Sequence, residues 1–211
     1  MAKIKKIIIL DAQPVYGLGL EKILWEHKVY RVKASVTLAA VMFEYIGNDA
    51  ADLVILDLNL NDANGFEVLK QLKSDFPRIK VLIHTNINDS FSIQKCFSLD
   101  ADGFVHKAEP VNKIVEALDA IDNGDKYVPT YYVAERMAAI ARGHEFVPKP
   151  LSPKEIIVLR HICEGKTSQV IANELGLSVH TVNNHRKSIK KKTNCQSTID
   201  LHQYATINGL L

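Results

Sequence analysis

Residues 167–192 read TSQVIANELGLSVHTVNNHRKSIKKK and predict two helices separated by a tight turn. The first helix starts after a hydroxyl side chain, Thr167, and ends at Gly176, the residue type that a tight turn favours. The second helix starts at Ser178, a good N-cap, and meets no Gly or Pro before Asn194. A short helix, a turn and a longer helix match the length of a unit that reads DNA.

The second predicted helix has an apolar face and a polar face. At about 100° per residue, Val182, His185 and Ile189 share one face. The opposite face is unusual for a core helix, because Asn is a poor helix former whose amide needs hydrogen-bonding partners. DNA bases and phosphates supply such partners, whereas the alternative from this stretch alone is a solvated basic helix. We predict DNA contacts by the polar residues Thr181, Asn183, Asn184, Lys187 and Lys191.

The residues upstream of this unit predict one more helix. Ser152, Pro153 and Glu155 have the spacing of a capping box with proline at the first helical position, and the helix should end at Gly165. Together, residues 151–192 resemble the LuxR-type helix-turn-helix of NarL/FixJ-family response regulators. The matching residues are Glu155, Leu159, Gly165, Ile171, Ala172, Leu175, Gly176, Ser178, Thr181, Val182, His185 and Ile189.

This resemblance implies a small all-α domain of four helices that binds double-stranded DNA as a homodimer. Its last helix, from about residue 198, resembles the family's dimer contact and carries Ile199, Tyr204 and Ile207. Asn194 stands where the family usually has Gly. Asn is the next best tolerated residue in a left-handed helix cap, so we expect that conformation there.

Charge is distributed unevenly along the chain. The 211 residues are 47% hydrophobic, enough for one large or two small domains, and the net charge is +2. Residues 1–126 hold 15 basic and 18 acidic residues, whereas residues 151–211 hold 8 basic and 4 acidic residues. An acidic front and a basic end predict a regulatory or catalytic domain joined to a domain that binds a polyanion.

The composition argues against secretion and membrane insertion. Lysines precede an apolar run at the N-terminus, as in a signal peptide, but the run at residues 7–10 is too short for one. No segment approaches the ~20 apolar residues of a membrane span. The three cysteines, Cys96, Cys163 and Cys195, have no metal-type spacing. We therefore expect a cytoplasmic protein with free thiols and no membrane contact.

The front of the chain alternates strand and helix patterns. Short apolar runs predict strands, and longer runs with helical spacing predict helices. Five such units predict a five-stranded parallel sheet, doubly wound, with helices on both faces. The predicted strands are residues 6–10, 30–36, 53–56, 81–83 and 104–105, and the predicted helices are residues 15–25, 38–46, 66–72, 91–99 and 111–121.

Polar residues follow four of these strands. Asp11 follows the first strand, Asp57 the third, Thr85 the fourth and Lys107 the fifth. Because the carboxyl ends of parallel strands meet at one edge of a sheet, we expect these side chains to form one site. No G-x-G-x-x-G or P-loop pattern follows a strand, which weakens a dinucleotide or NTP-binding interpretation.

Residues 3–125 resemble the flavodoxin-like receiver domain of two-component response regulators, with the motif DLNLNDANG at residues 57–65. The resemblance implies that Asp57 accepts a phosphoryl group from a sensor histidine kinase. It implies that Lys107 pairs with phosphoryl oxygens, that Thr85 hydrogen-bonds another, and that Phe104 is the aromatic switch residue. It further implies Mg²⁺ held by Asp57, the Asn59 carbonyl and Asp11.

One position departs from the receiver pattern. The family has two successive acids after the first strand, whereas here Asp11 is followed by Ala12. Ala12 stands where the family has the carboxylate that binds Mg²⁺ directly. Mg²⁺ prefers octahedral oxygen ligands and can retain waters, so we expect binding to be weakened.

Our first functional prediction is a sequence-specific DNA-binding transcriptional regulator controlled by phosphorylation at Asp57. The alternative is an atypical receiver that regulates DNA binding through protein contacts without phosphorylation, because of Ala12. A third interpretation is a phosphatase, but the sequence shows no second general acid that such an enzyme would need. We therefore expect that the protein is not an enzyme.

We divide the chain into three parts. Residues 1–125 are the predicted receiver domain, residues 126–150 a linker, and residues 151–211 the DNA-binding domain. Within the linker, residues 127–142 predict a helix, and residues 143–150, GHEFVPKP, predict an extended tether.

Overall fold

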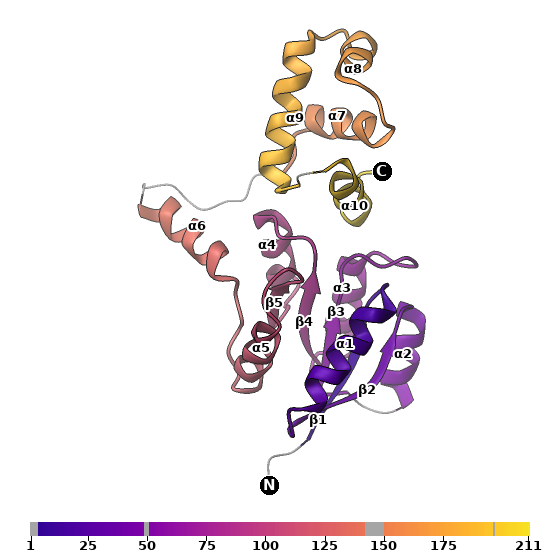
Figure 1. The fold of residues 1–211 in the computed structure, drawn as a ribbon, viewed down its shortest axis with the longest axis vertical. Coiled ribbons are helices and arrows are strands. Elements are labelled where there is room, and N and C mark those ends of the chain that lie inside the picture. Colours follow the sequence, from indigo (N-terminus) through magenta and orange to yellow (C-terminus); the bar gives the residue numbers. More distant parts are fainter. Residues whose placement is uncertain (1–3, 49–50, 142–149, 196) are drawn as a thin grey trace. The chain divides into compact units, whose positions relative to one another are not determined.

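A computed structural model describes residues 4–48, 51–141, 150–195 and 197–211 of the chain (Figure 1). The chain folds as two compact units. The first comprises residues 1–86 and 95–144, and the second comprises residues 87–94 and 145–211. No helix in the described ranges is long and apolar enough to cross a membrane.

The first unit is built on a five-stranded parallel sheet, which confirms the predicted fold class. The strand order is β2-β1-β3-β4-β5, and each neighbouring pair is parallel. The chain moves outward from β1 to β2 and then returns to β3, so the order reverses between two central strands, where parallel sheets place their sites. The strands are β1 (Lys5–Leu10), β2 (Tyr30–Val36), β3 (Leu53–Leu56), β4 (Lys80–Thr85) and β5 (Gly103–His106).

Helices connect the strands. A core cluster joins buried residues of α1 and α5 to the same face of the sheet, for example Leu24 and Leu118 against Ile9 and Ile55. Successive side chains of a strand point to opposite faces, and the central strand β3, LVIL, is apolar and buried at every position because both faces of the sheet are covered. The neighbouring strand β4 is buried from Val81 to Thr85. The helices are α1 (Pro14–Trp25), α2 (Ala39–Asn48), α3 (Gly65–Asp75), α4 (Ser90–Ser98), α5 (Asn112–Asp122) and α6 (Thr130–Ala141).

The linker helix begins later than the sequence predicts. We expected a helix from residue 127, but Tyr127 extends the sheet instead. Its carbonyl accepts from the Phe104 N–H at 3.0 Å, and its own N–H donates to the Asp102 carbonyl at 3.0 Å. These bonds hold Tyr127 against the edge strand β5 and delay the helix to Thr130. Most of the predicted tether lies outside the described residues.

The second unit contains α7 (Pro153–Cys163), α8 (Ser168–Leu175), α9 (Val179–Thr193) and α10 (Thr198–Ile207). The predicted capping box is present, since Glu155 N–H donates to Ser152 Oγ at 3.3 Å and Ser152 N–H donates to Glu155 Oε2 at 2.7 Å. Gly176 has φ +63° and Asn194 has φ +56°, so both helix ends adopt the expected left-handed conformation. The four helices enclose their own apolar core, which includes Val182 and Ile189.

Candidate functional site

The carboxyl edge of the sheet brings three of the predicted residues together. Asp11 follows β1, Asp57 follows β3 and Lys107 follows β5. Backbone hydrogen bonds extend beyond the strand ends and fix these positions. The Asp57 N–H donates to the Leu10 carbonyl at 2.9 Å, and the Lys107 N–H donates to the Thr85 carbonyl at 2.8 Å.

The Lys107 ammonium bridges the two carboxylates. Its Nζ lies 2.7 Å from Asp11 Oδ2 and 2.7 Å from Asp57 Oδ2, and its side chain is fully buried. The second oxygen of each carboxylate accepts a backbone N–H, from Gln13 at 2.9 Å and from Asn59 at 3.0 Å. Each acid is thereby oriented by its own loop.

Burial and charge act in opposite directions in this cluster. Burial alone would lower the pKa of Lys107, but attraction to Asp57 and the hydrogen bond to Asp11 hold that pKa above its ordinary value. Burial also raises the pKa of Asp57, and the nearby Lys107 charge offsets this only in part. The ammonium is therefore held in its charged form as the counter-ion of the site.

The other predicted residues of this edge lie in β4, in β5 and in the loops that follow β1 and β3. Thr85 and Phe104 are fully buried at β4 and β5, and Asn59 is half-buried two residues after Asp57. Ala12 is half-buried beside Asp11 and offers no carboxylate. The roles of Thr85, Phe104 and Asn59 in phosphoryl binding, switching and metal binding stay predictions.

The donor set suits a hard cation only in part. Carboxylate oxygens are ligands that Mg²⁺ prefers, and Asp11 and Asp57 supply them. Within the described ranges, however, no three His, Cys, Asp or Glu side chains are grouped as a metal site. The cluster therefore offers two carboxylates where the receiver pattern has three acids.

Two residues that the sequence analysis did not select also lie at this site. The ring of Tyr16, in α1, lies over the Lys107 ammonium, with Nζ 4.2 Å from the ring centroid. His84, in β4, packs edge-on against Tyr16 with ring centroids 6.3 Å apart. Burial and the charge of Lys107 lower the pKa of His84 to about 4, so its ring is neutral near pH 7. No local sequence pattern marks either residue.

The helix α9 presents the predicted DNA-contacting residues at its surface. Asn183, Asn184, Lys187 and Lys191 are exposed. Thr181 is half-buried, and its Oγ1 lies 2.8 Å from Ser178 Oγ in the first turn. Val182 and Ile189, on the opposite face, are fully buried. The arrangement leaves one face of α9 polar and basic, as major-groove reading requires.

Lys192 has a structural contact that the sequence did not reveal. Its Nζ donates to Glu155 Oε2 at 2.7 Å, and Ser188 Oγ donates to Glu155 Oε1 at 2.6 Å. Burial raises the pKa of Glu155, but the bonds from Lys192, Ser188 and Ser152 outweigh it and lower that pKa to about 2. The buried carboxylate thus joins the start of α7 to the end of α9.

The predicted dimer residues are placed unequally in α10. Ile199 is 71% exposed, whereas Tyr204 and Ile207 are buried. Tyr204 belongs to the apolar core of its own domain. Its ring therefore packs inside the domain, whereas the side chain of Ile199 is exposed. The dimer roles of the three residues stay predictions.

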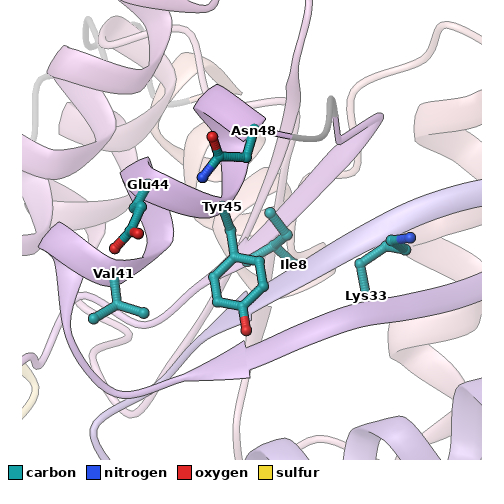
Figure 2. Close-up of a pocket in the computed structure, with 6 residues that line it drawn as sticks. All are labelled: Ile8, Lys33, Val41, Glu44, Tyr45 and Asn48. Atoms are coloured by element: carbon teal, nitrogen blue, oxygen red, sulfur yellow. The ribbon is translucent and has the colours of Figure 1, made fainter.

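A separate cavity of ≈590 Å³ lies beside α2 and contains none of the predicted site residues (Figure 2). Tyr45, Glu44, Val41 and Asn48 line it from α2, and Lys33 lines it from β2 (Figure 2). Ile8 of the buried strand β1 forms the remaining part of its lining. Nothing in the sequence motifs assigns this cavity a role.

Comparison with known proteins identifies both parts of the chain. The response regulator receiver domain family matches residues 7–119, and the family described as bacterial regulatory proteins, luxR family, matches residues 149–205. Fimbriae Z protein of Salmonella typhimurium is 30% identical over 97% of this chain and 98% of its own length. The DNA-binding transcriptional activator EvgA of Escherichia coli K12 is 29% identical over 96% of this chain and 98% of its own length.

Solved structures give the same result. RcsB of Salmonella enterica serovar Typhimurium, bound to promoter P1flhDC in the presence of the phosphomimetic BeF₃⁻, is 26% identical with a TM-score of 0.73. The match covers 97% of this chain and 98% of that chain. A structure of two RcsB dimers bound to two parallel DNAs has the same identity and TM-score, with 97% and 99% covered. The chain therefore belongs to the NarL/FixJ family of two-component response regulators, with a receiver domain and a LuxR-type DNA-binding domain.

Proposed function

We propose that this response regulator accepts a phosphoryl group on Asp57 and that the reaction controls sequence-specific binding of double-stranded DNA through α9. The observation that carries the proposal is the contact between Asp57 and Lys107. A carboxylate nucleophile with a buried ammonium 2.7 Å away has the charge arrangement that phosphoryl transfer to Asp requires.

The transfer uses groups that are already in place. An Asp57 carboxylate oxygen forms a bond to phosphorus, the bond between phosphorus and the leaving group breaks, and the leaving group keeps the electron pair. The leaving group is a histidine imidazole when a sensor kinase is the donor and acetate when acetyl phosphate is the donor. Lys107 then pairs with a phosphoryl oxygen, and the Thr85 hydroxyl donates to another.

A divalent cation completes the proposed chemistry. Asp11, Asp57 and the carbonyl of Asn59 would hold Mg²⁺, which supplies positive charge beside the transferred phosphoryl group when it is bound. Because Ala12 provides no carboxylate, we propose that this site binds Mg²⁺ more weakly than a site with three acids. Lys107 already neutralises part of the charge of the two carboxylates, which further reduces their attraction for a cation.

DNA recognition is assigned to the exposed face of α9. In this proposal Asn183 and Lys187 contact base edges, Asn184 and Thr181 assist, and Lys191 contacts phosphate. The known complexes of RcsB dimers with DNA support binding as a homodimer, for which we propose Ile199 of α10 as a contact. We also propose that a sensor histidine kinase is the phosphoryl donor and that the protein is cytoplasmic. The proposed receiver domain is residues 1–125, and the proposed DNA-binding domain is residues 151–211.

The atypical receiver remains a second candidate because of a specific observation. Lys107 bridges Asp11 and Asp57, and Ala12 supplies no carboxylate where the family has its direct metal ligand. A receiver held in this state would regulate DNA binding through protein contacts without accepting a phosphoryl group.

One experiment separates the two candidates. The intact chain is incubated with acetyl phosphate and Mg²⁺, and its mass is measured together with its affinity for duplexes selected from a random library. We expect one added phosphoryl group, which Asp57→Asn abolishes, and a change in DNA affinity only in the labelled protein. Selective DNA binding with no labelling would favour the atypical receiver, whereas an absence of duplex binding would contradict both candidates.

A further inference from the structure

The first turn of α1 is physically joined to the proposed phosphoryl site. Gln13, the N-cap residue of α1, donates its N–H to Asp11 Oδ1 at 2.9 Å. Its carbonyl in turn accepts from the Tyr16 N–H at 3.0 Å. These two bonds place the backbone of Tyr16 at a defined position relative to the Asp11 carboxylate.

The ring of Tyr16 contacts the ammonium that serves this acid. Lys107 Nζ lies 4.2 Å from the ring centroid, and its side chain is fully buried. An ammonium within about 6 Å of an aromatic face is attracted by the negative charge of that face, more strongly where water is excluded. Two carboxylates and one aromatic face thus surround Lys107 Nζ.

A second ring supports the first. His84 of β4 meets Tyr16 in a T-shaped contact, with an interplanar angle of 70°. Because His84 is neutral near pH 7, it does not repel the ammonium. Tyr16, His84 and Lys107 also line a cavity of ≈280 Å³. Removal of the ring would enlarge this cavity beside the ammonium and admit water to it.

We propose that Tyr16 is a positioning residue for phosphoryl transfer to Asp57, whose ring face holds the Lys107 ammonium against the carboxylates and keeps water from it. This inference rests on the proposed function, because Tyr16 acts through Lys107 on a reaction at Asp57. A Leu side chain is apolar but smaller than the Tyr ring, and it has no negative face. The aromatic ring, and not its hydroxyl, is the feature that matters.

The test compares two variants of Tyr16 in the intact chain. Tyr16→Leu should lower the initial rate of labelling by acetyl phosphate about tenfold, equivalent to ~1.4 kcal/mol of activation free energy. Tyr16→Phe keeps the aromatic face and should stay within about twofold of the wild type. Trp25→Leu is the matched control, because Trp25 lies in the same helix and its exposed ring also contacts a cation, with Arg31 Cζ 5.0 Å from the ring centroid. The labelling rate of this variant should equal that of the wild type.

A direct readout of the contact accompanies the rates. An aromatic face shifts the NMR signals of nearby protons, so the methylene protons next to Lys107 Nζ should be shifted in the wild type and in Tyr16→Phe. The shift should disappear in Tyr16→Leu, while its melting temperature stays close to that of the Trp25→Leu control.

The outcomes separate this inference from the function on which it rests. If the wild type is labelled at Asp57 and Tyr16→Leu is labelled as fast, the inference is wrong and the proposed function stands. Equal slowing in Tyr16→Phe or in Trp25→Leu would also overturn it, because the aromatic face would not be the cause. A wild-type chain that is not labelled at all would overturn the proposed function, and the inference with it.

Discussion

At the scale of single residues, the properties of the proposed phosphoryl site depend on the charges of Asp11, Asp57 and Lys107 and on the acid that is missing at Ala12. Lys107 pairs with two carboxylates inside a buried cluster and neutralises part of their charge, and the position that the family fills with a third acid holds Ala12. In the metal-free cluster each acid is paired with the buried ammonium and also accepts a backbone N–H. The missing carboxylate is therefore tolerated by the fold but should limit cation binding.

Restoring that carboxylate should have two measurable effects. Ala12→Asp should raise Mg²⁺ affinity and speed labelling of Asp57 by acetyl phosphate, because it adds a direct oxygen ligand. It also places three carboxylates together, so the metal-free protein should melt at a lower temperature and gain more from added Mg²⁺ than the wild type. Melting curves with and without Mg²⁺ measure this.

Ala12→Asn is the matched control for Ala12→Asp. It has nearly the same shape but no added charge, so it should not reproduce the loss of metal-free stability. If Ala12→Asp altered neither the Mg²⁺-dependent melting shift nor the labelling rate, the absent acid would not be what limits the site.

At the scale of elements, α9 divides its faces between core packing and recognition. Val182 and Ile189 are buried, whereas Asn183, Lys187 and Lys191 are exposed. Base contacts and phosphate contacts have different signatures, because only base contacts carry sequence information. Substitutions along one helix can therefore distinguish the two.

Asn183→Ala and Lys187→Ala should each cost about 1–3 kcal/mol of DNA-binding free energy and relax base preference. Lys191→Ala should weaken binding to all duplexes alike and reduce the salt dependence, because it removes a phosphate contact. Binding measured at several salt concentrations, with selected and random duplexes, gives both quantities. Unchanged affinity and preference in the first two variants would exclude α9 as the reading helix.

The buried carboxylate of Glu155 fixes α7 to α9, and its effect on stability should depend on pH. Its pKa is lowered to about 2 from an ordinary value of 4.5, so the unfolded state takes up a proton first as pH falls. The stabilisation is therefore fully present above about pH 4.5 and is lost as pH falls toward 2. Glu155→Gln should lower the free energy of unfolding by about 1–3 kcal/mol at pH 7, because Lys192 loses its charged partner.

Urea unfolding of residues 151–211, followed by circular dichroism at several pH values, tests this. The difference between Glu155→Gln and the wild type should shrink as pH falls below 4.5. Glu164→Gln is the control, since that side chain is 55% exposed, and it should leave the unfolding midpoint unchanged at pH 7. A pH-independent difference for Glu155→Gln would show that its charge is not the source of the stability.

At the scale of the whole molecule, the two units carry opposite charge. Residues 1–126 have more acidic than basic residues, whereas residues 151–211 have twice as many basic as acidic residues. DNA binding is favoured by net positive charge and weakened by salt, so the acidic receiver should reduce the attraction of the intact chain for any duplex.

The isolated segment of residues 151–211 should therefore bind duplex DNA at least as tightly as the intact, unlabelled chain. The segment has its own apolar core, so it should fold alone, which circular dichroism checks. The difference in affinity should diminish as salt is added. A folded segment that bound much more weakly than the intact chain would mean that the receiver contributes to binding, for example by forming a dimer.

The sequence by itself determined the elements and much of the candidate site. Helix starts at Ser152 and Ser178 and the left-handed end at Asn194 depend on interactions within a few residues, so local patterns predict them. The parallel sheet follows from repeated strand and helix patterns. The meeting of Asp11, Asp57 and Lys107 then follows because parallel strands end at the same edge.

The tertiary structure alone decided contacts between distant segments. No helical or strand periodicity and no helix-capping pattern predicts three of these contacts. They are the Tyr16 ring over Lys107, the Lys192 ammonium on Glu155, 37 residues away, and Tyr127 against β5. Tyr204 likewise reads as an apolar position of α10, and only the packing of four helices shows that it faces the core. Such contacts depend on the order of the strands and on how helices pack, because these bring together side chains that no short stretch of sequence contains.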